Sequence, residues 1–163
     1  MDLGTSPRVT AGNCRRAVGS FCGMELMARD MERIPRANLR VPLRDFGWLW
    51  IDVERRADEL AVADGTDGYL TGVLKTCRWV GRSWSQSNSP TSRSGELALS
   101  PITGRSEAAY EELIVEEVIA AEQWLGREWP GLPGYVEGVN ATLAWTWRRS
   151  GKPPIEVAQL QAG

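Results

Sequence analysis

The stretch from Glu107 to Trp129 carries the longest uninterrupted helical pattern in the chain, and it constrains the fold more than any other feature. It contains no Pro and one Gly, Gly126, and it combines acidic residues with strong helix formers. Val115 and Ile119 widen its apolar stripe, so we expect a helix buried on more than one side, onto which the other elements fold. The stripe itself has the spacing of one helix face and consists of Tyr110, Leu113, Ile114, Val118, Ala121, Trp124 and Leu125.

Acidic residues fill the rest of this predicted helix: Glu111, Glu112, Glu116, Glu117 and Glu122. Paired carboxylates on a helical bundle can bind two iron ions, but that chemistry uses Glu-x-x-His pairs on facing helices. The chain has no His. We therefore expect a solvated acidic face and no metal.

Three further helices are predicted, two before this one in the sequence and one after it. The first follows an N-cap at Asp45 and ends before a C′ glycine at Gly65. Thr66 or Asp67 caps the next, which runs to about residue 82, so a short connection makes these two an antiparallel hairpin. Small residues in the second, such as Gly72, would let a neighbouring helix approach closely. The last runs from about 135 to 149, with a short strand over 143–148 as the alternative.

The fold class that follows is all-α, a small antiparallel bundle of about four main helices in one domain, residues 45–155. Residues 1–44 read as an Arg-rich arm, with an irregular leader at 1–23 and a short helix at 24–34 that Pro35 ends. A long Ser-rich loop at 83–105 is expected to be mobile, because it has too little apolar surface to offset its ordering entropy. Residues 156–163 read as a C-terminal tail.

Charge is divided unevenly along the chain. Residues 1–44 hold eight Arg and four acidic residues, a net charge of +4, so the remainder carries −6 of the total of −2. A basic arm on an acidic body indicates contact either with nucleic acid or with an acidic protein partner. Arg36, Arg40 and Arg44 are the candidate nucleic-acid-binding residues. The alternative is a solvated arm neutralised by the body, which would itself repel phosphate.

The composition removes much of the catalytic repertoire. Without His there is no Ser-His-Asp or Cys-His arrangement, and Cys14, Cys22 and Cys77 have no zinc-site spacing. The odd number of Cys and the lack of a secretory signal favour reduced thiols in the cytoplasm, with Cys77 a small buried hydrophobe. No apolar run is long enough to cross a bilayer, and the turns at 65–68 and 131–134 are not phosphate loops. We expect no cofactor and no membrane contact.

Trp is unusually frequent, with eight residues against two Phe and three Tyr. Indole rings are enriched at protein interfaces, where the ring is apolar and the N–H needs a partner. The candidate partner-binding residues are therefore Trp124, Trp129, Trp145, Arg148, Arg149 and Trp48. The alternatives are that the Trp residues fill the core and that the two Arg residues cap their own helix. The tight turn after residue 129 should place Trp124 and Trp129 near Tyr135, in a cluster separate from Trp145 and Trp147.

These observations favour a non-enzymatic interaction protein: an acidic helical adaptor, inhibitor or antitoxin-like partner of another cytoplasmic protein, or a homo-oligomer. A nucleic-acid-binding regulator that uses the arm is the main alternative. An enzyme using carboxylates and Arg, or an assembly subunit, stays open. A binding surface is expected at 124–129 and on the Ser-rich loop that leads into the long helix.

Overall fold

The computed structural model describes residues 31–82, 84–85 and 96–158. Their elements are η1 (Arg36–Asn38), α2 (Leu43–Val62), α3 (Gly68–Val80), β1 (Trp84–Ser85), β2 (Glu96–Leu97), α4 (Glu111–Trp124) and α5 (Tyr135–Thr146). The predicted all-α bundle is confirmed, since the strands form only one antiparallel pair of two residues each. Residues 31–33 are helical and fall within the range 24–34 predicted as a short helix, the rest of which lies mostly outside the described residues. Residues 1–30, 83, 86–95 and 159–163 lie outside the described part, and with them most of the arm and much of the Ser-rich loop.

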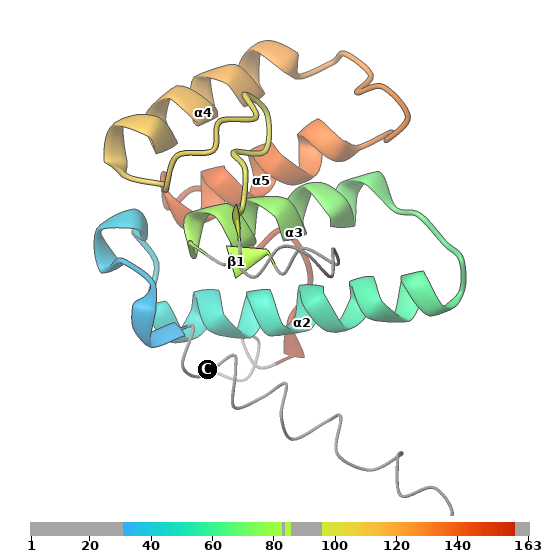
Figure 1. Ribbon diagram of the computed structural model, residues 1–163, viewed down its shortest axis with the longest axis horizontal. Coiled ribbons are helices and arrows are strands. Elements are labelled where there is room, and N and C mark those ends of the chain that lie inside the picture. The colour runs from blue at the N-terminus through green and yellow to red at the C-terminus, as the bar shows by residue number, and fades with distance from the viewer. Residues whose placement is uncertain (1–30, 83, 86–95, 159–163) are drawn as a thin grey trace, which may run out of the picture.

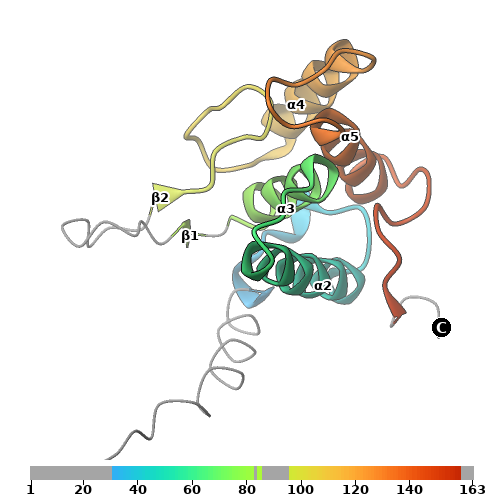
Figure 2. The same cartoon turned by 90° about the vertical axis from the view of Figure 1, so that its right-hand side faces the viewer.

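The main helices stack in the order α2, α3, α5, α4 (Figure 1, Figure 2). α2 and α3 run antiparallel, as their short connection predicted, and so do α4 and α5 (Figure 1). α3 and α5 start at the same end of the bundle, where Gly68 lies against Pro133. α3 is therefore at the centre and contacts both α2 and α5, whereas α4 packs mainly on α5. The prediction that the other elements fold onto residues 107–129 is wrong.

Glycine makes the close approach between α3 and α5 possible. A β-carbon at Gly72 would lie 2.2 Å from the carbonyl oxygen of Tyr135, and one at Gly138 would lie 2.1 Å from that of Tyr69. Backbone atoms cannot retreat from such contacts unless the helices separate. The expectation that small residues on α3 admit a neighbouring helix is confirmed, and that neighbour is α5.

The ends of α2 differ from the prediction. The helix begins after Pro42 and not after Asp45, because proline fixes a φ that suits this boundary and its carbonyl accepts the Asp45 N–H at 3.0 Å. Asp45 lies instead in the first turn, where its negative charge interacts favourably with the positive end of the helix dipole. At the other end the residue with positive φ is Asp64, at 50°, and not Gly65.

The other two boundaries agree better with the pattern. Asp67 is the N-cap of α3, as predicted, and its side chain accepts a hydrogen bond from the Leu70 N–H at 3.0 Å. α5 starts at the predicted residue and ends at Thr146, three residues before the predicted Arg149. The strand alternative at 143–148 is not adopted.

α4 begins four residues later and ends five residues earlier than the predicted range 107–129. Tertiary donors take the backbone acceptor that the first turn would need. The Ala109 carbonyl accepts from Asn38 Nδ2 at 3.0 Å, and from Arg82 Nε and Nη2 at 3.0 and 2.8 Å. Beyond the other end, Gly126 has a φ of 78°, which turns the chain away from the helix axis.

One face of α4 is open to solvent. Val115 and Ile119 are 42% and 47% exposed, so the prediction that they are buried is wrong. Tyr110 and Leu125, just beyond the ends of α4, are exposed as well. The helix packs on α5 and on the turn at 100–105, and neither covers this face.

The described end of the arm packs into the bundle. Ile34 and Leu39 belong to the buried core, and the Asn38 side chain is buried. The Arg40 N–H donates to the Thr146 carbonyl at 2.8 Å, at the residue where α5 ends. Residues 34–40 therefore serve as part of the domain.

The chain after α5 returns along α2 and α3. Val157 is buried, the Tyr69 hydroxyl donates to the Pro154 carbonyl at 2.7 Å, and Arg56 Nη2 donates to the Glu156 carbonyl at 2.6 Å. These contacts include the first residues of the predicted tail. Among the described residues, no helix combines the length and the apolar character that crossing a bilayer requires.

Candidate functional site

A groove of about 430 Å³ opens beside α3, where the chain leading to α4 meets the start of α5. We call it the aromatic groove. Its lining consists of Lys75 and Arg78 from α3, residues 97–102 and Gly104 from the chain before α4, Trp129 from the turn before α5, and Tyr135, the first residue of α5. Three segments that are distant in sequence therefore form one concave surface.

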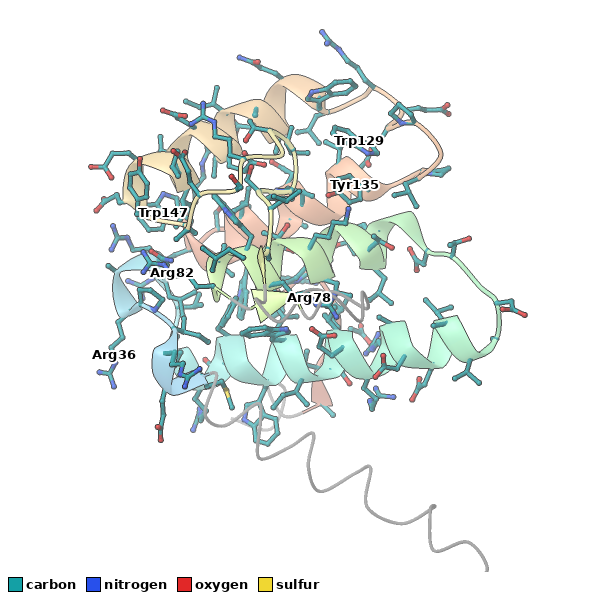
Figure 3. The ribbon with its side chains drawn as sticks, viewed as in Figure 1. Arg36, Arg78, Arg82, Trp129, Tyr135 and Trp147 are labelled. Atoms are coloured by element: carbon teal, nitrogen blue, oxygen red, sulfur yellow. The ribbon has the colours of Figure 1, made fainter. Side chains whose placement is uncertain are left out.

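Aromatic rings form one wall of the groove. The ring centroids of Trp124 and Trp129 are 5.1 Å apart, and those of Trp129 and Tyr135 are also 5.1 Å apart. Figure 3 shows Trp129 and Tyr135 together, far from Trp147 at the opposite end of the bundle. The predicted separation into two clusters is confirmed. The Tyr135 hydroxyl donates to the Pro101 carbonyl at 2.7 Å and ties this wall to the opposing segment.

A buried carboxylate holds the opposing wall. Glu117 is 1% exposed, so the prediction that it lies on a solvated acidic face is wrong. Its Oε1 accepts from the backbone N–H groups of Ile102 and Thr103, the second at 3.1 Å, and its Oε2 accepts from the Thr103 hydroxyl at 2.7 Å. A buried charge is tolerated only where such donors replace water. Glu117 therefore fixes the turn that carries this wall.

The turn is also closed internally. The Ser100 N–H donates to the Arg105 carbonyl at 2.9 Å, and the Arg105 N–H donates to the Ser100 hydroxyl at 2.8 Å. Gly104 adopts a φ of 67° within it. Leu99 precedes the turn and is 55% exposed, although it lines the groove. The described end of the Ser-rich segment thus places the exposed side chain of Leu99 next to a turn whose backbone is held by hydrogen bonds.

Two cations border the groove, and they differ in their partners. Arg78 donates to Glu54 through Nε at 2.7 Å and Nη2 at 2.5 Å, and this hydrogen-bonded pairing raises the pKa of the guanidinium. Lys75 Nζ lies 5.6 Å from the ring centroid of Tyr135 and forms no ion pair with any described carboxylate. Its positive charge is thus available at the apolar surface.

The titratable groups of this site favour binding over acid–base chemistry. Burial, and after it the negative charge of Glu117, raise the pKa of Tyr135, so its phenol stays a neutral hydrogen-bond donor. Cys77 is a buried free thiol whose pKa is raised by burial, as expected for a core residue. In the described ranges no three Cys, Asp or Glu side chains gather where they could hold a metal ion.

The predicted partner-binding residues divide into several locations. Trp129 lines the groove, and Trp124 contacts its ring in an edge-to-face arrangement. Trp145 is 8% exposed and belongs to the core, which makes it unavailable to a partner. Trp48 is partly exposed on α2, away from the groove lining.

Arg148 and Arg149 follow the end of α5 on the surface. Arg148 pairs with Glu122 of α4, and Arg149 has a positive φ of 53°. Neither belongs to the lining of the groove. Their role in partner binding stays a prediction.

The candidate nucleic-acid-binding residues are partly engaged by the body. Arg40 lies over the Trp147 ring at 4.1 Å and pairs with Glu111 at 3.0 Å, and Arg44 pairs with Asp45 at 3.3 Å. Arg36 is exposed at the same end of the bundle as Trp147 (Figure 3). The nucleic-acid alternative stays a prediction, but two of its three arginines already have acidic neighbours.

A second hollow, of about 370 Å³, lies between α2 and the start of α3 and includes Ile155. Its polar groups are committed to internal contacts. Arg56 pairs with Asp52 at 2.9 Å and also holds the Glu156 carbonyl, while Tyr69 holds Pro154. This hollow is the seam along which the C-terminal segment packs, so the aromatic groove is the better candidate site.

Sequence reasoning identified Trp129 and the Ser-rich segment but missed Glu117 and Lys75. A signal for Glu117 existed, because it falls on the same helix face as Leu113, Ile114 and Ala121. Lys75 gave no local signal, since its position at the groove depends on how distant segments meet. Comparison of the chain with protein-family models, with curated proteins and with solved structures finds no match in any of the three.

Proposed function

We propose that this chain is a non-enzymatic interaction module, of the adaptor, inhibitor or antitoxin-like kind, that receives a segment of another protein in the aromatic groove. The observation that carries the proposal is the groove itself, with Trp129, in contact with the buried ring of Tyr135, on one side and Leu99 on the other. Aromatic side chains in such settings supply much of the affinity of protein interfaces. The predicted reduced thiols make the cytoplasm our expected location for the complex.

The rigidity of both walls supports this role. Tyr135 and Glu117 are nearly inaccessible to solvent and make four hydrogen bonds to residues 101–103. A preorganised surface loses little conformational entropy on binding, which favours affinity. The polar groups that hold the walls are engaged with one another, so the groove offers a shaped apolar surface with a cation beside it.

Photo-crosslinking in the organism of origin tests the proposal. A benzoylphenylalanine replaces Leu99 in one variant and Val62 in a control, because Val62 is 89% exposed at the end of α2 and lies outside the groove lining. We expect one defined protein to be crosslinked from position 99 and not from position 62. Identical adducts at both positions, or none at position 99, would reject the groove as an interaction site.

The partner identified in this way should then bind the purified chain with one-to-one stoichiometry. Leu99→Asp should weaken that complex at least tenfold, because it places a charge in the apolar surface without disturbing the core. Val62→Asp is the matched control and should leave affinity unchanged. Circular dichroism of both variants would establish that the fold is retained.

A further inference from the structure

The cations at the aromatic groove differ in what they can still bind. Arg78 gives two hydrogen bonds to Glu54, and Glu54 also accepts from Trp50 Nε1 at 2.9 Å, so the charge of Arg78 is already paired with a carboxylate of α2. Lys75 has no described carboxylate as a partner, and its ammonium group lies over the face of Tyr135. An ammonium ion placed beside apolar surface favours a ligand that presents an anion and an apolar group together.

Size restricts the shape of that ligand. The volume of about 430 Å³ is near the lower end of ligand pockets, which span about 300–1,000 Å³. A helix with its side chains has a diameter of about 10 Å and would lie across such a groove without entering it. A short extended peptide, with one side chain against Trp129 and Leu99, fits the space better.

The spacing of charge and apolar surface indicates which part of a peptide enters. Lys75 lines the same groove of about 430 Å³ as Trp129 and Leu99, so an anion paired with Lys75 and an apolar side chain against those two residues must lie close together. In an extended chain an internal acidic residue and its neighbours point to opposite faces. A terminal carboxylate, in contrast, is attached to the same α-carbon as the last side chain, so one residue supplies both groups.

Long-range electrostatics agrees with a single anion. Residues 45–163 carry a net charge of −6, which disfavours an acidic tract approaching the body. Glu117 lies behind the turn, with both oxygens occupied by its donors, so it does not neutralise Lys75. One carboxylate at the end of a neutral or basic tail is compatible with these charges.

We therefore propose, building on the interaction role above, that the aromatic groove binds the C-terminus of a partner protein, with the last apolar side chain against Trp129 and Leu99 and the terminal carboxylate paired with Lys75. Capture of a C-terminal carboxylate is a recurring mode of peptide recognition, in which backbone N–H groups are the usual donors, and here the Lys75 ammonium group would take their place. Lys75 is the specificity-determining residue of this site.

Fluorescence polarisation with defined hexapeptides tests the proposal on the full-length chain. The probes are fluorescein-labelled peptides that end in Leu, Phe or Trp, each as the free acid and as the carboxamide. We expect at least one free acid to bind at least tenfold tighter than its carboxamide, with a preference that decreases as salt rises. Lys75→Met should abolish that preference, and Lys75→Arg should retain it. Lys152→Met is the control and should change nothing.

Several results would overturn the proposal. Equal affinities for acid and carboxamide, an undiminished preference in Lys75→Met, or no binding of any hexapeptide at 1 mM in the assay would each do so. A peptide with an internal Asp and a blocked end that binds equally well would exclude the chain end, and full competition by 3-phenylpropionate would point to a small carboxylate instead. If the hexapeptides fail while position 99 still crosslinks a partner, the chain-end inference falls and the interaction role stands.

Discussion

Replacing Glu117 tests whether one buried carboxylate holds a wall of the aromatic groove. In Glu117→Leu the N–H groups of Ile102 and Thr103 and the Thr103 hydroxyl lose their acceptor. Leaving a buried donor unpaired costs about 1–3 kcal/mol, but Thr103 is near the surface and water would satisfy part of the loss. We expect the free energy of unfolding to fall by about 3 kcal/mol, which lowers the melting temperature by about 9 °C in a chain of this size.

Glu117→Gln separates the charge from the hydrogen bonds. The amide oxygen can still accept from both backbone N–H groups, and the hydroxyl of Thr103 can rotate to accept from the amide nitrogen. Only the charge assistance is lost, so we expect destabilisation of about 1 kcal/mol. Glu116→Leu is the matched control, because Glu116 is exposed and Arg105 is its one ion-pair partner among the described residues, so its loss should cost less than about 1 kcal/mol.

Urea unfolding followed by tryptophan fluorescence would measure all three variants. The midpoints should decrease in the order Glu116→Leu, Glu117→Gln, Glu117→Leu, with unchanged m-values. Amide hydrogen exchange at Ile102 and Thr103 should accelerate in Glu117→Leu more than exchange in α3 does. If Glu117→Leu is as stable as Glu116→Leu, the carboxylate does not hold the turn and the preorganised wall must be abandoned.

Two further predictions concern α3 and Tyr135. Gly72→Ala should lower the free energy of unfolding in urea by about 3 kcal/mol, because the new β-carbon would lie 2.2 Å from the Tyr135 carbonyl oxygen. Gly126→Ala is the control, since the space around Gly126 is open, and it should cost only about 1 kcal/mol of backbone strain. Equal losses in the two variants would contradict the close packing of α3 on α5. Burial raises the pKa of Tyr135 above its ordinary value of 10.0, so the folded state holds the phenolic proton more tightly than the unfolded state does. The stability that this provides is present below pH 10 and should be lost as the pH rises beyond it. Tyr135→Phe should therefore show a smaller alkaline decrease in its urea midpoint, and an equally steep decrease would refute the contribution of Tyr135 to the pH dependence.

The helices could be predicted because their periodicity is a local property. The Asp67 cap, the start at residue 135 and the pairing of Trp129 with Tyr135 all follow from patterns within a few residues. The start of α4 could not be predicted in this way, because the Ala109 carbonyl accepts a hydrogen bond from the Asn38 side chain, which is distant in sequence. Helix propensity describes what a segment prefers in isolation, and here a tertiary donor changes the outcome.

The acidic residues of α4 show the same limit in the candidate site. Glu116 and Glu117 are neighbours of identical chemistry, yet one is exposed in an ion pair and the other is buried under the turn at 100–105. Helix phase distinguishes them, since residue 117 shares its face with Leu113 and Ala121. The helix phase alone does not predict the hydrogen-bond donors of Ile102 and Thr103 that make burial of the Glu117 carboxylate tolerable.

The aromatic groove therefore depends on how two segments that are distant in sequence fit together. Trp129 and the Ser-rich segment were both predicted as places for a binding surface, and the structure brings them together through Glu117 and Tyr135. Both connecting side chains are buried, so a partner would contact neither of them. Substitutions at residue 117 should accordingly alter binding through the position of Leu99, whereas Lys75→Met should alter it with the fold unchanged.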